Sequence, residues 1–408
     1  MSTFGILVGG GPAPGINGVI RAAATAARRL GHGVIGIYDG FSAIMQGDTG
    51  NVVTLDEDAV ARIHLVGGSI LHTSRANPTK QPEHLANVVA SLDRLGIDHL
   101  ITIGGDDTAS SANRVAEEAG GRIKVVHVPK TIDNDLPLPK QIPTFGFETA
   151  REHGTAVVER LILDMQTTNR WFFVEMMGRS AGHLALGVGK AAGAPVTVIP
   201  EEFTHPIQLE QVVRVLEGAI VKRLARGRPD GVAVIAEGIA SAMDPADPLL
   251  SDAPRDEHGH VRLAEVPLTN VLRTQVRESL AARGIQVTIG QKDVGYELRC
   301  GYPTAFDRDY TQDLGAGAVL TLLEGRSSAL ITRQEGRIVP IPFEEIIDPA
   351  TNRSRVRGVD TGSDSYRVAL ALQDRVTASD LENPDVVAAL AEAANLSVDE
   401  AKQRYQTT

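Results

Sequence analysis

Two short acidic segments of this sequence combine carboxylates with glycine and lysine: GGDDT at residues 104–108 and PKTIDND at residues 129–135. Phosphoryl transfer needs a base near the accepting hydroxyl, cations on the phosphates, and donors for the charge that develops in the transition state. Asp106 or Asp135 can hold Mg²⁺, which usually binds one or two carboxylates and keeps several waters. Asp133 can accept a proton from a sugar hydroxyl. The alternative for each aspartate is a helix N-cap or a turn carboxylate, but together the segments predict phosphoryl transfer.

Positive groups for such a centre are available from three places. Lys130 and Arg75 can neutralise a phosphate chain by charge, although an arginine such as Arg75 is commonly a solvated surface group. The loop GGGPAPG at residues 9–15 can bring backbone N–H groups to a phosphate at the start of a helix. Its glycine spacing matches neither the dinucleotide fingerprint nor the P-loop. A tight turn between strand and helix therefore remains the alternative.

The elements expected to position these segments alternate between strand and helix. Apolar runs predict them over residues 4–8, 16–30, 33–38, 85–95, 99–103, 108–119 and 124–128. This alternation implies parallel strands joined by right-handed crossovers. Loops that follow such strands gather along one edge of the sheet, where open α/β sheets bind ligands. The glycine loop and both acidic segments are expected to share that edge.

A second α/β unit is expected after residue 145. Strands are predicted over residues 171–176, 195–199, 231–236 and 285–289, and helices over 149–165, 182–192, 207–224, 270–283, 306–323 and 386–405. Residues 290–303 are dense in polar groups and are interpreted as a loop. Residues 329–341 are interpreted as a hairpin around Gln-Glu-Gly.

Composition limits the class of protein. The 408 residues suffice for one large or two medium domains. With 40 basic and 51 acidic residues the formal charge is −11, which argues against nucleic acid and an anionic bilayer as partners. The apolar stretch at residues 6–16 is too short and too rich in glycine to span a membrane. The single cysteine, Cys300, excludes an intrachain disulfide and most thiolate metal sites, so a cytoplasmic location is expected.

The ordered motifs resemble the phosphofructokinases, and specifically their pyrophosphate-dependent branch. The resemblance covers about residues 4–323 and rests on the three loops together with Met177–Arg179, Glu237 and Tyr296–Arg299. Gly-Gly-Asp alone would not be specific, because NAD kinases and lipid kinases carry similar signatures. The resemblance implies an α/β fold of two similar Rossmann-like three-layer domains with mostly parallel sheets. The active site is expected in the cleft between them.

The same resemblance implies the reaction and the division of labour. The expected activity is reversible, Mg²⁺-dependent transfer of a phosphoryl group from pyrophosphate to the 1-hydroxyl of fructose 6-phosphate, in glycolysis and gluconeogenesis. The products are fructose 1,6-bisphosphate and phosphate. The phosphoryl-donor domain is expected over residues 1–145 plus about 298–348. The sugar-phosphate domain and C-terminal helices are expected over residues 146–297 plus about 349–408.

Roles for individual residues follow from the resemblance. Gly11 binds the phosphoryl donor and Asp106 serves the Mg²⁺. Asp133 is the base for the 1-hydroxyl, with Thr131 and Asp135 beside it. The sugar phosphate is expected to be held by Met177, Gly178, Arg179, Glu237, Tyr296 and Arg299.

A further residue implied by the resemblance concerns the subunit arrangement. Arg170 stands seven residues before Met177 and matches an arginine that family members lend across a subunit interface. At least a dimer is therefore implied, and a homodimer or homotetramer is expected.

Donor choice depends on Asp107 and Lys130. ATP-using relatives usually have glycine in place of Asp107, where the α-phosphate of the nucleotide passes, and an aspartate adds bulk and negative charge against it. Two like charges about 4 Å apart repel by about 4 kcal/mol at an effective dielectric of about 20. Lys130 replaces a glycine of many ATP enzymes and can hold pyrophosphate, although some ATP enzymes also have lysine there. Phe41 and Pro12, in place of a tyrosine and an aspartate of the ATP branch, favour the same donor.

Alternatives remain. An ATP-dependent phosphofructokinase is disfavoured by Asp107. A non-catalytic regulatory subunit is disfavoured because five residues are retained together: Asp106, Asp133, Arg179, Glu237 and Arg299. Use of sedoheptulose 7-phosphate as the acceptor is a matter of pocket shape that the sequence does not decide.

Overall fold

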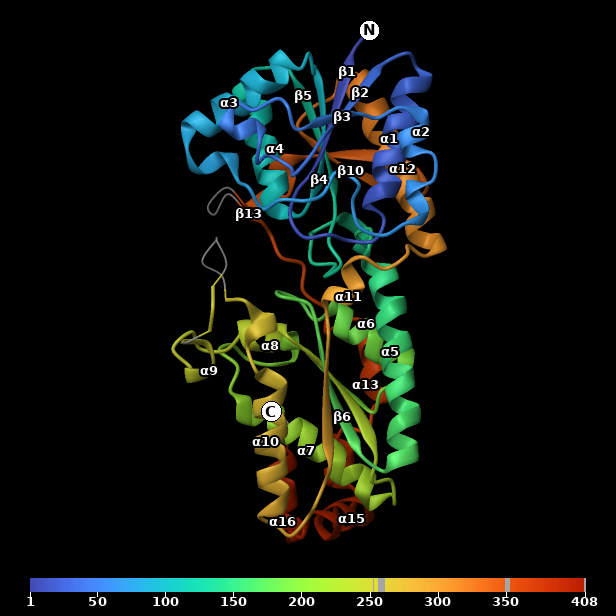
Figure 1. Ribbon diagram of the computed structural model, residues 1–408. Coiled ribbons are helices and arrows are strands. Elements are labelled where there is room, and N and C mark those ends of the chain that lie inside the picture. Colours follow the sequence, from blue (N-terminus) through green and yellow to red (C-terminus); the bar gives the residue numbers. More distant parts are fainter. Residues whose placement is uncertain (252, 256–260, 349–352, 407–408) are drawn as a thin grey trace. The chain divides into compact units, whose positions relative to one another are not determined.

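The computed structural model describes residues 1–251, 253–255, 261–348 and 353–406 (Figure 1). The chain forms two compact units, and each is assembled from two separate segments. The first comprises Met1–Ala150 and Tyr296–Arg357, and the second comprises Arg151–Gly295 and Gly358–Thr408. Within the described ranges, no helix is both long enough and apolar enough to cross a membrane.

The first unit is built on a seven-stranded sheet with the order β11-β10-β5-β4-β1-β2-β3. The parallel strands are β1 (Thr3–Val8), β2 (Gly33–Ile37), β4 (His99–Gly104), β5 (Lys124–Pro129) and β10 (Ala329–Gln334). The edge strands β3 (Val52–Thr54) and β11 (Arg337–Pro342) are antiparallel to their neighbours. β10 and β11 confirm the predicted hairpin. Every residue of β4 is buried, as expected for a central parallel strand covered on both faces.

Helices cover both faces of this sheet (Figure 1). α1 (Ile16–Arg29) and α12 (Ala305–Leu323) share a buried core with every second residue of β1. α3 (Pro82–Arg94) and α4 (Asp106–Ala119) share a separate core with Leu7, on the opposite face of the same strand. Because successive strand residues point to opposite faces, this division produces a three-layer unit. Shorter elements of the unit are α2 (Glu57–Val60), α11 (Tyr296–Arg299), β12 (Ile347–Asp348) and β13 (Arg353–Ser354).

The second unit contains a four-stranded parallel sheet with the order β7-β8-β6-β9. Its strands are β6 (Trp171–Met176), β7 (Val196–Val198), β8 (Gly231–Ala236) and β9 (Ile289–Val294). Its helices are α5 (Phe147–Thr168, of which the first turn belongs to the first unit), α6 (His183–Ala192), α7 (Leu209–Ala225), α8 (Gly238–Ser241), α9 (Pro248–Ser251) and α10 (Leu268–Ala281). Both sheets confirm the predicted α/β class with mostly parallel strands.

Three sequence-based assignments were wrong. β9 covers Ile289–Val294, so the strand predicted over residues 285–289 lies too early, and residues 290–303 include strand and helix as well as loop. The edge position of β9 explains the error, because Gln291, Lys292 and Asp293 are exposed and leave no apolar run. The single helix predicted over residues 386–405 is two helices, separated at Asn395, which adopts a left-handed conformation with φ 52°.

The C-terminal helices belong to the second unit, where α15 and α16 lie beside α7. They are α13 (Asp364–Ala371), α14 (Ala378–Glu382), α15 (Pro384–Ala394) and α16 (Val398–Tyr405). Glu217 of α7 is fully buried and accepts hydrogen bonds from Arg404 and Tyr405 of α16. These bonds to Glu217 therefore attach α16 to the core of the second unit.

Candidate active site

The glycine loop and the two acidic segments lie at one edge of the first unit's sheet. The last residues of β1, β4 and β5 pair in register, since Val8 lies opposite Ile103 and Gly104 opposite Pro129. The pairing continues into the loops, where the Lys130 N–H donates to the Gly104 carbonyl at 2.7 Å. The prediction that the three loops share a sheet edge is confirmed.

Two glycines allow the loops to approach each other closely. A Cβ added at Gly9 would lie 2.4 Å from Thr108 Oγ1, and a Cβ added at Gly104 would lie 2.4 Å from Thr108 Cβ. A side chain at either position would clash with Thr108 in the first turn of α4. This turn carries Asp106 and Asp107, and both residues are exposed.

Lys130 is the buried cation of this edge. Its side chain is only 6% exposed, and its Nζ donates to the Gly11 carbonyl at 2.6 Å. Burial lowers the pKa of Lys130 to about 8; the nearby charge of Arg299 adds to this effect, while Asp133 and other carboxylates oppose it. The ammonium thus points at the glycine loop, where it could also donate a hydrogen bond to a bound anion.

Three carboxylates act on one another in the same region. Burial raises the pKa of Asp135 to about 7, and the negative charges of Asp133 and Asp106 raise it further. In the described part of the chain, no group of three or more His, Cys, Asp and Glu side chains could hold a metal by itself. Mg²⁺ fits such a site, because it usually binds one or two carboxylates and takes the rest of its ligands from water and substrate phosphates. A divalent cation would also relieve the repulsion between the carboxylates.

His127 is a buried residue that hydrogen-bonds to the end of β4. It is fully buried on β5, its Nε2 lies 2.9 Å from the Gly104 carbonyl, and its Nδ1 lies 2.8 Å from Thr102 Oγ1. Burial lowers the pKa of His127 to about 3, so the ring is neutral and its Nε2–H can donate to the carbonyl. No local sequence pattern marks the bond to Gly104.

Arg75 and Arg299 border the glycine loop. The carbonyl of Ser74 accepts a hydrogen bond from the Gly10 N–H at 2.8 Å, which places the exposed Arg75 next to this contact along the chain. A Cβ added at Gly11 would lie 3.7 Å from Arg299 Cζ. The guanidinium of Arg299 also lies 5.0 Å from the ring centre of Tyr296, a geometry typical of a cation–π contact. Tyr296 and Arg299, which are predicted to hold the sugar phosphate, both belong to the first unit.

The second unit brings together another group of predicted residues. Met177 and Gly178 follow β6, and Glu237 follows the neighbouring strand β8. The Gly178 N–H donates to Glu237 Oε1 at 3.0 Å, and the Glu237 N–H donates to the Met176 carbonyl at 3.0 Å. Gly178 has φ 149°, which side chains rarely adopt. Arg179 follows directly and is partly exposed.

Arg170 is not part of that group within its own chain. It precedes β6, whereas Met177 follows it, and a strand of this length separates its ends by about 20 Å. The Arg170 guanidinium pairs with Asp164 at 2.8 Å and lies 4.9 Å from the ring centre of Phe172. A role beside Met177–Arg179 would therefore require a second subunit.

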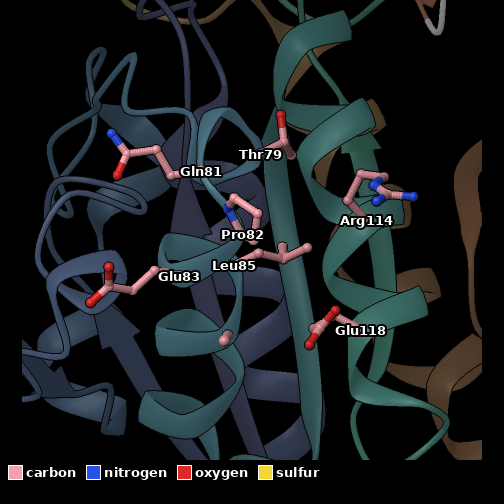
Figure 2. Close-up of a pocket in the computed structure, with 8 residues that line it drawn as sticks. Thr79, Gln81, Pro82, Glu83, Leu85, Arg114 and Glu118 are labelled. Atoms are coloured by element: carbon pink, nitrogen blue, oxygen red, sulfur yellow. The ribbon is translucent and has the colours of Figure 1, made fainter.

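A separate surface pocket lies between the start of α3 and the outer side of α4 (Figure 2). Its lining residues are Thr79, Gln81, Pro82, Glu83, Leu85, Ala86, Arg114 and Glu118. None of the residues discussed above lines it.

Comparison with known proteins places the chain in a family. The profile of the phosphofructokinase family matches residues 3–322. The pyrophosphate–fructose 6-phosphate 1-phosphotransferase of Thermotoga maritima is 52% identical, over 99% of this chain and 98% of that protein. A protein of the same name from Naegleria fowleri is 46% identical, over 99% of this chain and 95% of that protein. An ATP-dependent 6-phosphofructokinase of Mycobacterium tuberculosis is 34% identical, over 84% of this chain and 94% of that protein.

Solved structures agree on the fold. A phosphofructokinase from Saccharomyces cerevisiae superposes over the whole of this chain with a TM-score of 0.69 and 21% identity, and this chain spans 48% of the yeast chain. A pyrophosphate-dependent phosphofructokinase from Marinobacter aquaeolei has a TM-score of 0.69 and 19% identity, over 90% of this chain and 88% of that one. The profile match, the curated relatives and this shared fold together show that the chain belongs to the phosphofructokinase family.

Proposed function

We propose that this protein catalyses reversible transfer of a phosphoryl group from pyrophosphate to the 1-hydroxyl of fructose 6-phosphate. The 52% and 46% identical relatives carry the name of this activity over nearly their whole length. The observation that carries the proposal is the buried ammonium of Lys130 on the Gly11 carbonyl, beside a cluster of carboxylates. This combination suits a compact, highly charged donor such as pyrophosphate.

The donor is assigned to the first unit. Gly11, Lys130 and Arg75 would hold the pyrophosphate by backbone groups and positive charge. Mg²⁺ would be held by Asp106, with Asp135 as a second candidate ligand, and would neutralise charge on the phosphates.

The transfer itself requires a base and a good position for the acceptor. Asp133 takes the proton of the 1-hydroxyl as the hydroxyl oxygen forms a bond to phosphorus. The bond from phosphorus to the bridging oxygen of pyrophosphate breaks, and phosphate leaves with that electron pair. Lys130 stabilises the negative charge that develops on the phosphoryl groups, and Thr131 and Asp135 are assigned to the same side of the acceptor.

Two groups of residues are assigned to the sugar phosphate. Met177, Gly178, Arg179 and Glu237 would bind the sugar, and Tyr296 with Arg299 would bind its 6-phosphate. Arg170 would come from a neighbouring subunit, so we propose a homodimer or homotetramer. A cytoplasmic location and a role in glycolysis or gluconeogenesis follow from the proposed substrates.

The direct test is a coupled assay of fructose 6-phosphate turnover with Mg²⁺ and pyrophosphate, ATP or ADP as the donor. We expect pyrophosphate to support formation of fructose 1,6-bisphosphate, and chelation of Mg²⁺ to stop it. The reverse reaction, from fructose 1,6-bisphosphate and phosphate, is expected to run under the same conditions. An isolated protein that turns over no donor would instead favour a regulatory subunit.

The pKa of Lys130 predicts the pH dependence of donor use. In the free enzyme Lys130 is charged below its pKa of about 8 and neutral above it, so kcat/KM for pyrophosphate is expected to fall as the pH rises through about 8. In Lys130→Arg the charge persists across this range, and the fall near pH 8 should disappear. Ionisation of pyrophosphate itself affects both proteins equally. If the fall in kcat/KM near pH 8 persists in Lys130→Arg, it is not caused by deprotonation of Lys130.

A further inference from the structure

The loop that carries Asp133 and Asp135 contains a residue in an unfavourable backbone conformation, which surrounding contacts must stabilise. Asn134 lies between the two aspartates and has φ 57°, in the left-handed region. Non-glycine residues occupy this region infrequently, and asparagine is among those that tolerate it. A change at this one residue would turn the flanking carboxylates in different directions. The orientation of the Asp133 and Asp135 side chains therefore depends on the contacts that stabilise the conformation of Asn134.

Arg357 fixes it from one side. Its Nε and Nη2 donate to the Asn134 carbonyl at 3.1 and 2.9 Å, and Nη2 also donates to Asn134 Oδ1. Its Nη1 donates to the carbonyls of Leu138 at 3.3 Å and Ile142 at 2.9 Å. Its own backbone N–H donates to the Asp135 carbonyl at 2.7 Å. One side chain thus binds one carbonyl of the acidic loop, at Asn134, and two carbonyls of the segment that follows it.

Thr144 completes the support from the other direction. Its N–H donates to Asn134 Oδ1 at 3.1 Å, and its hydroxyl donates to the Thr131 carbonyl at 2.6 Å. These two bonds reach the side chain of Asn134 and the start of the loop. The Asn134 carbonyl, whose orientation follows directly from the left-handed conformation, is bound by Arg357.

The charge of Arg357 is buried and compensated by its surroundings. The residue is only 9% exposed, and burying a guanidinium is costly unless its donors and its charge are compensated. The carbonyls compensate the donors. The negative charge of Asp135 acts favourably on the guanidinium, so Arg357 in turn favours the charged form of Asp135.

We infer that Arg357 is a positioning residue that holds the loop Thr131–Asp135 in the conformation needed for phosphoryl transfer. This inference rests on the proposed function for its catalytic consequence. Arg357 lies beyond residues 3–322, which the family profile matches, and reaches the loop from the last segment of the first unit. Because its hydrogen bonds to Asn134, Leu138 and Ile142 hold the loop and the segment after it, we assign it a role that acts through the loop.

The test compares Arg357→Ala and Arg357→Lys with the wild type in the pyrophosphate assay. We expect kcat to fall about 100-fold in Arg357→Ala, as for a displacement of about 1 Å in the catalytic groups, with KM for pyrophosphate changed less than about threefold. Arg357→Lys keeps the charge but not the forked donors, and should lose about tenfold. Methylguanidinium should restore part of the activity of Arg357→Ala. A kcat within about twofold of the wild type in Arg357→Ala would overturn the inference.

Arg223→Ala is the matched control. Arg223 is 6% exposed in the second unit, and it binds the Asp230 carbonyl and the Asp230 and Asp374 carboxylates. Its loss should lower stability without changing kcat per folded molecule. An equal loss of kcat in Arg223→Ala would assign the Arg357 effect to general destabilisation and overturn the inference.

Hydrogen exchange of the resting protein gives a readout that does not depend on the reaction. Peptides that cover residues 131–147 should exchange faster in Arg357→Lys than in the wild type, whereas peptides from β6 and β8 should not. If the wild type lacks turnover, the proposed function fails while this measurement still tests the loop. Unchanged exchange over residues 131–147 would overturn the inference about Arg357 even if the wild type is fully active.

Discussion

Replacement of Asp133 by asparagine is expected to lower kcat with pyrophosphate by about 1,000-fold. General acid–base catalysis by a positioned side chain typically contributes between about 100-fold and 10,000-fold, and asparagine keeps the size of aspartate while losing its capacity to accept a proton. Binding of fructose 6-phosphate should change little, because the amide retains hydrogen-bonding groups. Steady-state kinetics at saturating pyrophosphate and Mg²⁺ measures both parameters.

The control for this variant is Asp93→Asn in the same unit. Asp93 pairs with Arg122 at 2.8 Å, where both side chains are largely exposed, and such a pair contributes little to stability. Its kcat should equal that of the wild type. If Asp133→Asn keeps more than a tenth of the wild-type kcat, Asp133 is not the base.

Replacement of Asp107 by glycine is expected to raise kcat/KM for ATP by about 100-fold. Two like charges about 4 Å apart repel by about 4 kcal/mol at an effective dielectric of about 20. Asp107 is exposed, so solvent and salt should screen part of that repulsion. Glycine in the first turn of α4 costs the helix about 1 kcal/mol or less, which the unit can tolerate. Adding Lys130→Gly should lower the use of pyrophosphate and strengthen the preference for ATP.

Asp107→Asn separates charge from size. Asparagine removes the negative charge but keeps the volume of the side chain, so an ATP gain similar to that of Asp107→Gly would assign exclusion to electrostatics. A gain found only with glycine would assign it to bulk. If neither variant uses ATP better than the wild type, Asp107 does not select the donor.

The sequence was sufficient to predict the parts of the fold that depend on buried apolar runs. β1, β4 and β5 are central strands, so their residues are mostly apolar on both faces and their ends could be located. The loops after them carry the predicted site residues, and parallel pairing requires these loops to lie at one edge. β9 was placed wrongly for the opposite reason, since an exposed edge strand needs no apolar run.

Contacts between distant segments could not be predicted in the same way. Arg357 binds residues that lie more than 200 positions earlier in the chain, and nothing in its local sequence marks it as different from a surface arginine. The same holds for His127 and the Gly104 carbonyl, and for Glu237 and the Gly178 N–H. Sequence motifs indicated which residues gather at the site, whereas the bonds that orient them required the structure.

The most direct test of the central claim is the ratio of kcat/KM for pyrophosphate to kcat/KM for ATP, measured on the purified wild-type protein. The assay would use fructose 6-phosphate as the acceptor and saturating Mg²⁺, with formation of fructose 1,6-bisphosphate as the readout. Exclusion of nucleotides by Asp107 and retention of pyrophosphate by Lys130 predict a ratio of at least about 100. A ratio below one would contradict pyrophosphate as the donor and identify an ATP-dependent enzyme.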